Sequence, residues 1–419
     1  MSTKIRNIIF IFICICVFST VFIYLGTKKM NILPESYING TYSYLEGAKL
    51  QSRPTFSLEN FTKGTFQTQT EKWIGTKVPK RDSVMLFNAK VQRSVINVAN
   101  TAFNFDSIPT YFGSKYAYTK SLDLISRQSN QKSETYAEKY QQVAQAINEF
   151  VEDNPNLNVT FAIPSRLEFS ENNPTFNLTS NPIDKEFRTE NLIEKLNSSV
   201  NYVDIFTDSL DEQMEEFFRT DPHWSIKGAK SAFDKLVTDG SLGLDSVAVG
   251  EYVQFEKPDF YGSSSRASLM LSKDSDHITD YVLDFTGFKI YINNESVELN
   301  EIDGCVSYQN GNYDKKNLFK DRYTEYFQKA KGRPSKLEFV SENKNGKQLL
   351  VIGDSYTSAI QRFFAYSYEK VVRLDHEESL KANVSLKGTI SENNFTNVLI
   401  LLNDNAFLGH DEFLELLKS

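Results

Sequence analysis

The last third of the sequence alternates strand-like and helix-like segments, and this alternation constrains the fold more than any other feature. Three apolar runs, "QLLVIGD" (348–354), "VVRLD" (371–375) and "NVLILLND" (397–404), are separated by stretches with helical character, beginning with residues 355–370. Strands that are apolar almost without interruption are buried on both faces, as in a parallel sheet covered by helices. The sequence therefore predicts an α/β fold, with a parallel sheet flanked by helices.

The same rhythm occurs upstream. Residues 134–152 place apolar side chains at helical spacing, and the strand "NVTFAIP" (158–164) follows them. A charged helix is expected over about 184–198, before the strand "YVDIF" (202–206). A further helix is expected after Ser225, whose side chain can cap the first turn. These elements extend the predicted α/β pattern over much of the chain.

Two other regions depart from this rhythm. Residues 56–110 predict short helices with an irregular break at "VPKRD". Residues 245–346 contain the Gly- and Ser-rich patch "DFYGSSSRAS" (259–268) and a hairpin pattern that turns near Asn293-Asn294. We expect residues 245–346 to form a partly β insertion in the α/β domain.

The N-terminal segment contains an uncharged apolar run from Ile8 to Gly26. At 1.5 Å per residue, an α-helix of this length spans a hydrocarbon core of about 30 Å. The run is longer than the apolar part of a signal peptide, roughly 7–15 residues, and no small-residue cleavage site follows it. We therefore expect an uncleaved transmembrane anchor over residues 1–29 rather than a cleaved signal peptide, a polar stem over 30–55, and a catalytic domain over 56–419.

Composition and charge exclude several classes of protein. The net charge of −8 argues against a nucleic-acid partner, because phosphate binding requires clustered Lys and Arg. Two of the three cysteines, Cys14 and Cys16, lie within the apolar run, and Cys305 stands alone. No disulfide framework and no thiolate metal site can be built from them. The sequence predicts no cofactor and no metal.

The segment "VIGDSYTSA" places a serine where a buried strand gives way to a helix. The strand ends at Gly353-Asp354, and Ser355 stands at the expected helix start, where free N–H groups and the helix dipole stabilise an oxyanion. In parallel α/β sheets, sites form beyond the carboxyl ends of the strands. Ser355 is therefore a candidate nucleophile, although a serine or aspartate here can also be only a helix cap.

The segment "TDPHW" (220–224) holds one of the four histidines in the chain. A serine hydroxyl needs a base, and histidine suits that task near neutral pH. Asp221, two residues before His223, faces the same way in an extended or turn backbone and can orient the imidazole. Pro222 stiffens the turn. The pattern predicts that Asp221 and His223 form the acid–base half of a catalytic site.

Weaker signals surround these two segments. The strand end "LLND" offers Asn403 as a donor to an oxyanion, with Asp404 and Asn405 as lesser candidates. Four other residues are candidates for binding a substrate. The aromatic residues Trp224, Tyr261 and Tyr356 either stack on sugars or pack in the core. Arg266 either holds an anionic acceptor or lies on the surface. A metal hydrolase using Asp221, His223 and Asp354 matches no zinc ligand spacing.

Taken together, "GDSY" after a strand, "TDPHW" upstream of it and one N-terminal apolar segment resemble the SGNH-hydrolase-like proteins of the alginate O-acetyltransferase type. The nearest branch is that of the DHHW proteins of Gram-positive bacteria. The resemblance extends to "EKWIGTKVPKRD", "TFAIPSRLEF", "DFYGSSSRAS" and "VVRLD". Two departures are evident: Pro222 stands where that branch has a second histidine, and "LLND" lacks the glycine of the usual Gly-x-Asn-Asp block.

The resemblance implies an SGNH-hydrolase-like fold with Ser355 as nucleophile, His223 as general base and Asp221 as the orienting acid. It also implies that the Ser355 N–H contributes to the oxyanion hole. Family members move acetyl groups onto cell-surface or secreted polysaccharide, often with a membrane-bound O-acyltransferase as the acyl source. A single-pass membrane protein with its catalytic domain on the extracytoplasmic side is therefore expected.

Two alternatives remain open at the level of sequence. The first is a carbohydrate esterase or deacetylase of the same fold, in which water replaces the sugar hydroxyl. The second is a non-catalytic polysaccharide-binding or assembly protein. Geometry separates catalysis from binding, because Ser355 Oγ and the His223 ring must lie within hydrogen-bond reach, and a separation above about 8 Å excludes a catalytic pair.

Overall fold

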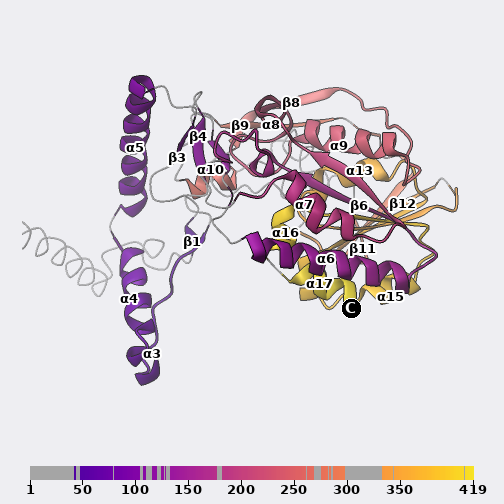
Figure 1. Cartoon of the computed structure of the whole chain (residues 1–419), viewed down its shortest axis with the longest axis horizontal. Helices are drawn as coiled ribbons and strands as arrows, with labels where there is room; N and C mark the ends of the chain where they lie inside the picture. Colours follow the sequence, from indigo (N-terminus) through magenta and orange to yellow (C-terminus); the bar gives the residue numbers. More distant parts are fainter. Residues whose placement is uncertain are drawn as a thin grey trace, which may run out of the picture. The chain divides into compact units, whose positions relative to one another are not determined.

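A computed structural model describes the chain in several stretches (Figure 1). The described residues are 42–43, 48–78, 80–103, 107–109, 116–119, 124–126, 128, 133–176, 182–260, 262–268, 275–281, 283–284, 286–297, 333–342, 344–409 and 411–419. The predicted anchor, residues 1–29, lies outside them. Among the helices that the structure describes, none combines the length and apolar character needed to cross a bilayer.

The chain divides into two units, the first being Met1–Ile96 with Leu269–Leu271 and the second Asn97–Ser268 with Ser272–Ser419. In its described residues, the first unit has one short strand pair and three helices, and the predicted break at "VPKRD" lies between the second and third helices. The third helix runs for 23 residues, so the expectation of short helices is wrong there. Ser57 caps the first of these helices by accepting a hydrogen bond from the Asn60 N–H. The elements are β1 (Tyr42–Ser43), β2 (Ala48–Lys49), α3 (Leu58–Thr62), α4 (Thr65–Gly75) and α5 (Arg81–Phe103), whose last residues belong to the second unit.

The second unit is built on an eight-stranded sheet with the order β11-β10-β12-β14-β13-β15-β6-β7. Five adjacent strands, β14 to β7 in that order, are parallel. The apolar runs predicted as strands form them, so this part of the prediction is confirmed. The parallel strands are β6 (Asn158–Ser165), β7 (Val200–Phe206), β13 (Gln348–Gly353), β14 (Lys370–Asp375) and β15 (Asn397–Leu401).

The other three strands of this sheet come from the expected insertion and run antiparallel. They are β10 (Phe288–Ile292), β11 (Glu295–Val297) and β12 (Lys336–Ser341). Asn293 and Asn294 form the predicted hairpin turn with φ of 50° and 71°, the left-handed conformation that two-residue hairpin loops require. The sheet is therefore mixed rather than wholly parallel, and part of the insertion extends it.

The sheet is covered on both faces, as its continuous apolar strands predict. Leu349 and Val351 belong to one apolar core, and Leu350 and Ile352 belong to the other. Helices α9 (Ile226–Asp239) and α13 (Thr357–Phe364) pack on the first face, whereas α6 (Ser133–Asp153), α16 (Asp404–Leu408) and α17 (Glu412–Lys418) pack on the second (Figure 1). Burying each such aliphatic side chain contributes about 1.5–3 kcal/mol, so the strand ends are held firmly in place.

Smaller elements complete the second unit. The strands are β3 (Ser107–Pro109), β4 (Tyr116–Thr119), β5 (Leu124–Ser126), β8 (Tyr252–Phe260) and β9 (Asp276–Tyr281). The helices are α7 (Lys185–Asn191), α8 (Leu210–Glu216), α10 (Ser263–Ala267), α14 (His376–Lys381) and α15 (Leu386–Ser391), with 3₁₀ turns at Leu167–Phe169 and Ile193–Lys195.

Three helix predictions need correction. The helix predicted over 184–198 is α7 followed by a 3₁₀ turn, and the one predicted over 355–370 spans only Thr357–Phe364. Ser355 therefore lies two residues before the helix rather than at its first position. Beyond Phe364, the Tyr366 and Ser367 N–H groups donate to carbonyls three residues back, so the chain forms a turn before β14 begins at Lys370. Ser225 occupies the position before α9, but its hydroxyl donates to the Glu216 carbonyl at 3.1 Å instead of capping the helix.

Candidate active site

Ser355, His223 and Asp221 form one continuous hydrogen-bonded chain. The His223 Nε2 atom lies 2.6 Å from Ser355 Oγ, although 132 residues separate the two in sequence. The other ring nitrogen, Nδ1, is hydrogen-bonded to Asp221 Oδ1. A hydroxyl, an imidazole and a carboxylate in this order are the parts of a Ser–His–Asp nucleophile system. His223 and Ser355 are both partly exposed, while Asp221 is buried.

The Ser355 turn depends on the close approach of two strand ends. A Cβ atom on Gly353 would lie 2.1 Å from Thr357 Cγ2 and 3.0 Å from the Leu401 carbonyl oxygen, so only glycine fits there. The Asp354 carboxylate then fixes the turn from both sides. It accepts hydrogen bonds from Tyr356 N–H at 2.8 Å and from Asn403 N–H at 2.9 Å, which links the ends of β13 and β15.

A buried arginine supports the same turn from β14. Arg373 donates to Thr357 Oγ1 at 3.0 Å and to the Asp354 carbonyl oxygen at 3.3 Å, one on each side of Ser355. Its remaining bonds go to the Pro334 carbonyl at 3.2 Å and to Asp375 Oδ2 at 2.8 Å. Burial lowers the pKa of this guanidinium, and the adjacent Asp375 carboxylate opposes that shift. Arg373 therefore holds the Ser355 turn (Gly353–Thr357, below called the nucleophile turn) in place.

The Asp221–His223 loop is a tight hairpin rather than a strand end. The Phe218 N–H donates to the His223 carbonyl at 3.1 Å, and the Ser225 N–H donates to the Glu216 carbonyl at 2.7 Å. These bonds close the loop just before α9 begins. The hairpin projects Asp221 and His223 together toward Ser355, as the two-residue spacing predicts.

A second carboxylate, that of Asp276 at the start of β9, binds the first strand of this hairpin at Arg219 and Thr220. It accepts bonds from Arg219 N–H at 3.0 Å, from Thr220 N–H at 2.7 Å and from Thr220 Oγ1 at 2.6 Å. Burial raises the pKa of Asp276, and the nearby Asp221 carboxylate acts in the same direction. The loop is thus anchored across a gap of more than 50 residues in sequence.

The segment that follows β8 encloses Asp221. A Cβ atom on Gly262 would lie 2.3 Å from Asp221 Cβ and 2.6 Å from Oδ2, so this position requires glycine. The next residue, Ser263, donates to Asp221 Oδ2 from its N–H at 2.7 Å and from its hydroxyl at 3.1 Å. Both carboxylate oxygens of Asp221 are therefore occupied, one by Ser263 and one by His223.

These contacts set the charge state of Asp221. Burial alone would raise the pKa of its carboxyl group. The charge and hydrogen bond of His223, together with the backbone N–H donors of Ser263 and His223, outweigh burial and lower the pKa from 3.8 to about 2. Asp221 is accordingly an anion at neutral pH, suited to stabilise an imidazolium on His223.

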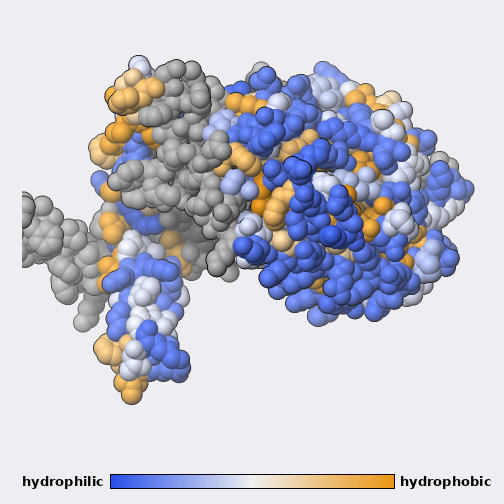
Figure 2. All heavy atoms as spheres, viewed as in Figure 1, coloured by the Kyte–Doolittle hydropathy of each residue, from blue (hydrophilic) through white to orange (hydrophobic). Residues whose placement is uncertain are grey.

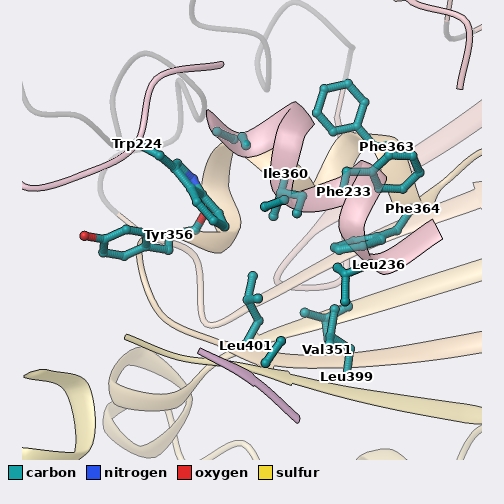
Figure 3. Packing of buried hydrophobic residues seen from close by; sticks show 14 of the residues in the cluster. Trp224, Phe233, Leu236, Val351, Tyr356, Ile360, Phe363, Phe364, Leu399 and Leu401 are labelled. Carbon is teal, nitrogen blue, oxygen red and sulfur yellow. The ribbon is translucent and has the colours of Figure 1, made fainter. Parts of the chain in front are cut away.

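Two aromatic residues join the hairpin to the Ser355 turn. The Trp224 Nε1–H donates to the Tyr356 carbonyl at 3.0 Å, and the Tyr356 hydroxyl donates to the Pro222 carbonyl. Their rings meet edge to face with centroids 5.3 Å apart, and the His223 ring lies 5.0 Å from that of Tyr356. Figure 3 shows both rings at one end of the apolar core. Each motif thus holds the backbone of the other.

The burial of these two rings corrects the expectation that they stack on sugars. Trp224 is 1% exposed and Tyr356 is 3% exposed, so neither presents a face to a ligand. Their role is packing, the alternative that the sequence left open. Of the remaining candidates for substrate binding, Tyr261 and the side chain of Arg266 lie outside the described residues.

Asn403 and its neighbours lie beside the nucleophile turn. The Asn403 side-chain amide donates to Asp354 Oδ2, and its oxygen accepts from the Asn405 N–H, which caps α16. Asp404 is buried and accepts hydrogen bonds from Tyr140 and Ser165, away from Ser355 Oγ. The structure gives Asn403 a part in holding the turn, and its use as an oxyanion donor stays a prediction.

The backbone N–H of Ser355 is the predicted oxyanion donor. Within the part of the chain that the structure describes, no acceptor pairs with it, whereas the following N–H groups of Tyr356 and Thr357 bind the side chain and carbonyl of Asp354. This free N–H belongs to the residue that carries the hydroxyl, two residues before α13 begins at Thr357, and it is available to developing negative charge on a substrate.

No metal centre is visible at this site. Over the described stretches, no group of three His, Cys, Asp or Glu side chains is arranged to hold a metal ion. Asp354 already accepts N–H donors on both oxygens. His376, the other histidine near a strand end, is buried behind the turn with Nδ1 3.2 Å from the Gly353 carbonyl.

Sequence reasoning missed the residues that hold the two motifs. Gly262 and Ser263 lie in the Gly- and Ser-rich patch quoted above, where a glycine among small residues is a sign of close backbone approach. Arg373 is a charge inside an otherwise apolar strand, which is a sign of a buried, paired cation. No local pattern marks Asp276 or its contact with Thr220.

Comparison with known proteins gives structural neighbours only. No protein-family model and no curated protein matches this sequence. The structure of a DHHW family protein from Eubacterium siraeum has a TM-score of 0.53 and 19% identity, covering 73% of this chain and 95% of that one. The structure of Bacillus cereus PatB1 with a sulfonyl adduct has a TM-score of 0.52 and 16% identity, covering 72% and 98%.

A third neighbour, the O-acetyltransferase domain of Pseudomonas putida AlgJ, has 11% identity and a TM-score of 0.39, covering 73% of this chain and 99% of that one. The first two matches show a shared fold at low sequence identity. They agree with the resemblance seen in the sequence, since a DHHW family protein is among them.

Proposed function

We propose that this protein is an O-acetyltransferase that acetylates a cell-surface or secreted polysaccharide through an acyl-enzyme on Ser355. The observation that carries the proposal is the 2.6 Å contact between His223 Nε2 and Ser355 Oγ, with Asp221 on the other ring nitrogen. It supports a catalytic pair over a binding protein, because a non-catalytic site has no need to align a base with a hydroxyl.

In the first half-reaction, His223 accepts the Ser355 hydroxyl proton as Oγ attacks the carbonyl carbon of an acetyl ester. The oxyanion of the tetrahedral intermediate forms next to the Ser355 N–H, and Asp221 stabilises the imidazolium. The intermediate collapses when the donor's ester bond breaks, and the imidazolium returns its proton to the departing alcohol. Ser355 then carries the acetyl group.

In the second half-reaction, His223 removes a proton from a sugar hydroxyl, and the resulting nucleophile attacks the acetyl carbon on Ser355. The new ester forms on the sugar, the Ser355 ester breaks, and the proton returns to Ser355 Oγ. Water in place of the sugar hydroxyl would give an esterase with the same residues. The two activities differ only in which acceptor reaches the acyl-enzyme.

The proposed setting follows from the sequence resemblance. The chain would be held in the cell membrane by residues 1–29, with residues 30–419 on the extracytoplasmic side. A membrane-bound O-acyltransferase partner would supply the acetyl group. The PatB1 structure is described with a sulfonyl adduct, and sulfonyl fluorides modify activated serines, so such a reagent is a suitable probe of Ser355.

The test is an assay of the full-length protein in detergent, with an acetyl ester donor and a panel of soluble oligosaccharides. Acetate release and acetylated oligosaccharide are measured in parallel by mass spectrometry. The proposal predicts acetylated sugar from the wild type and none from Ser355→Ala. Acetate release without transfer to any oligosaccharide or to isolated cell-wall glycan would assign an esterase instead.

A further inference from the structure

In the part of the chain that the structure describes, the exposed large apolar side chains are concentrated in residues 56–103, which form helices α3, α4 and α5 and the residues next to them. Eleven of the twelve large hydrophobic residues that are exposed in the described part of the chain lie between residues 56 and 103. They are Phe56, Leu58, Phe61, Ile74, Val78, Val84, Phe87, Val91, Val95, Val98 and Phe103. Only Tyr252, at 38% exposure, lies elsewhere. Concentration in one segment, rather than scatter, marks an interaction surface.

On α5 these side chains form a single stripe. Val84, Phe87, Val91, Val95 and Val98 follow one another at spacings of three and four residues, so they lie on one side of the helix. Each is 44–69% exposed. The helix has a separate buried side that carries Ala89 and Ile96. The exposed stripe is therefore additional to the face that packs, and Figure 2 shows apolar side chains at the surface of this segment.

Charge distinguishes this segment from the rest of the chain. Residues 56–103 hold seven Lys and Arg against three Asp and Glu, whereas residues 104–419 hold 33 against 49. Lys63, Lys72 and Lys90 are exposed on α3–α5 or the turn between them. The segment is thus basic and apolar at once, within a protein that is acidic overall.

We propose that α3–α5 dock on the surface of an anionic phospholipid bilayer. Helices that present Phe, Leu and Val on one side and Lys or Arg beside them lie in the interface of a membrane, with the apolar side chains between the lipid headgroups. The lysines add attraction to anionic lipid. The proposal rests on these exposures and charges, and it stands apart from the Ser355 chemistry and from the predicted anchor.

Two other occupants fit the surface less well. The remainder of the described chain exposes only Tyr252 among its large hydrophobics, so it offers no apolar patch to pair with eleven side chains. A second copy of the segment would bring two surfaces of the same positive sign together. A bilayer matches both the apolar stripe and the charge.

The test uses the full chain in proteoliposomes, with the native cysteines replaced by serine and one fluorophore-labelled cysteine introduced. Probe positions are Phe87→Cys and Val91→Cys on the stripe. The control is Asn97→Cys, an exposed position on another side of α5. Spin-labelled lipids quench fluorophores that enter the bilayer interface. The vesicles contain equal parts phosphatidylcholine and phosphatidylglycerol, or phosphatidylcholine alone.

We expect the probes at positions 87 and 91 to be quenched several-fold more than the probe at position 97, and only in vesicles with anionic lipid. Lys72→Glu combined with Lys90→Glu weakens the quenching roughly tenfold. The charge control, Lys387→Glu with Lys418→Glu on exposed sites of the second unit, leaves it unchanged.

Equal quenching at all three positions, or none, would overturn the proposal. So would quenching that does not depend on anionic lipid. Disulfide cross-links between Val91→Cys chains without lipid quenching would assign the surface to a second copy. Protection of position 91 from a water-soluble quencher without lipid quenching would assign it to another protein surface.

Discussion

The two halves of the candidate site are held in different ways. The nucleophile turn, Gly353–Thr357, is built where β13, β14 and β15 end, and residues of all three strands or their ends bind it. The acid–base hairpin, residues 217–225, rests on side-chain and backbone bonds to β9 and to the segment after β8. The first half is part of the central sheet, while the second is held by β9, which belongs to a separate two-stranded sheet, and by the segment after β8.

This difference predicts how substitutions act. A change in the turn disturbs strands that are buried on both faces, so it reduces stability and activity together. A change in the hairpin alters hydrogen bonds to a few atoms, so it reduces activity with a smaller loss of stability. The following substitutions test this contrast.

The largest effect is expected for Asp221→Asn. The asparagine amide carries no negative charge that could stabilise an imidazolium. Its NH₂ group also cannot accept a hydrogen bond, so it loses the bond that a carboxylate oxygen of Asp221 accepts either from His223 Nδ1 or from Ser263. We expect kcat for acetyl transfer or release to fall by about 10⁴-fold, with KM nearly unchanged. Steady-state kinetics with an acetyl ester measure this, and a loss below tenfold would remove Asp221 from the catalytic chain.

Gly262→Ala tests the hairpin's support. The added methyl group would lie 2.3 Å from Asp221 Cβ, so Asp221 must move. We expect kcat to fall about 10²-fold because the imidazole loses its alignment, and the free energy of unfolding to fall by about 1–3 kcal/mol.

Gly353→Ala is the matched change in the turn, with its methyl group 2.1 Å from Thr357 Cγ2 and 3.0 Å from the Leu401 carbonyl. It should lose more stability than Gly262→Ala in denaturant titrations. Equal losses of stability from the two variants would contradict the difference between the turn in the central sheet and the hairpin outside it.

Tyr356→Phe removes the hydroxyl that reaches Pro222. We expect a loss of about 1 kcal/mol in stability and a fall in kcat of a few-fold, because the hairpin is less firmly placed against Ser355. Tyr368→Phe is the control: it removes a comparable bond, from a tyrosine hydroxyl to the Leu242 carbonyl, away from the site. Its stability loss should be similar, and its kcat should stay at the wild-type value.

The last prediction concerns the stability of the fold at low pH, with no change in activity at neutral pH. The Asp221 pKa is lowered from 3.8 to about 2 in the folded protein. A lowered pKa stabilises the fold above the ordinary value and loses that contribution as pH falls through the folded value, so the loss falls between about pH 4 and pH 2. It amounts to about 2 kcal/mol. Denaturation of the wild type and Asp221→Asn across this range measures it, and a stability difference that does not change with pH would contradict it.

The same contrast explains what the sequence could predict. The parallel strands were predictable because burial on two faces leaves continuous apolar runs, and Ser355 was predictable because Gly353-Asp354 end such a run. Asp221 and His223 were predictable because their pairing is local.

The supports of the hairpin could not be predicted, because they join residues far apart in sequence without any periodic pattern. Asp276 reaches back 56 residues to Thr220, and Ser263 reaches back 42 to Asp221. Burial of Trp224 and Tyr356 was also open, since an aromatic residue beside a catalytic motif can face either the core or a ligand. The antiparallel direction of β12 follows from tertiary pairing and leaves no mark in its residues.

The most direct test of the central claim is the intact mass of the full-length protein after brief exposure to an acetyl ester donor. The wild type should gain the mass of one acetyl group, and peptide mapping should place it on Ser355. Ser355→Ala should gain none, while Ser358→Ala, one turn further along α13, should be acetylated as the wild type is. Acetylation that persists in Ser355→Ala at the wild-type rate would contradict the account.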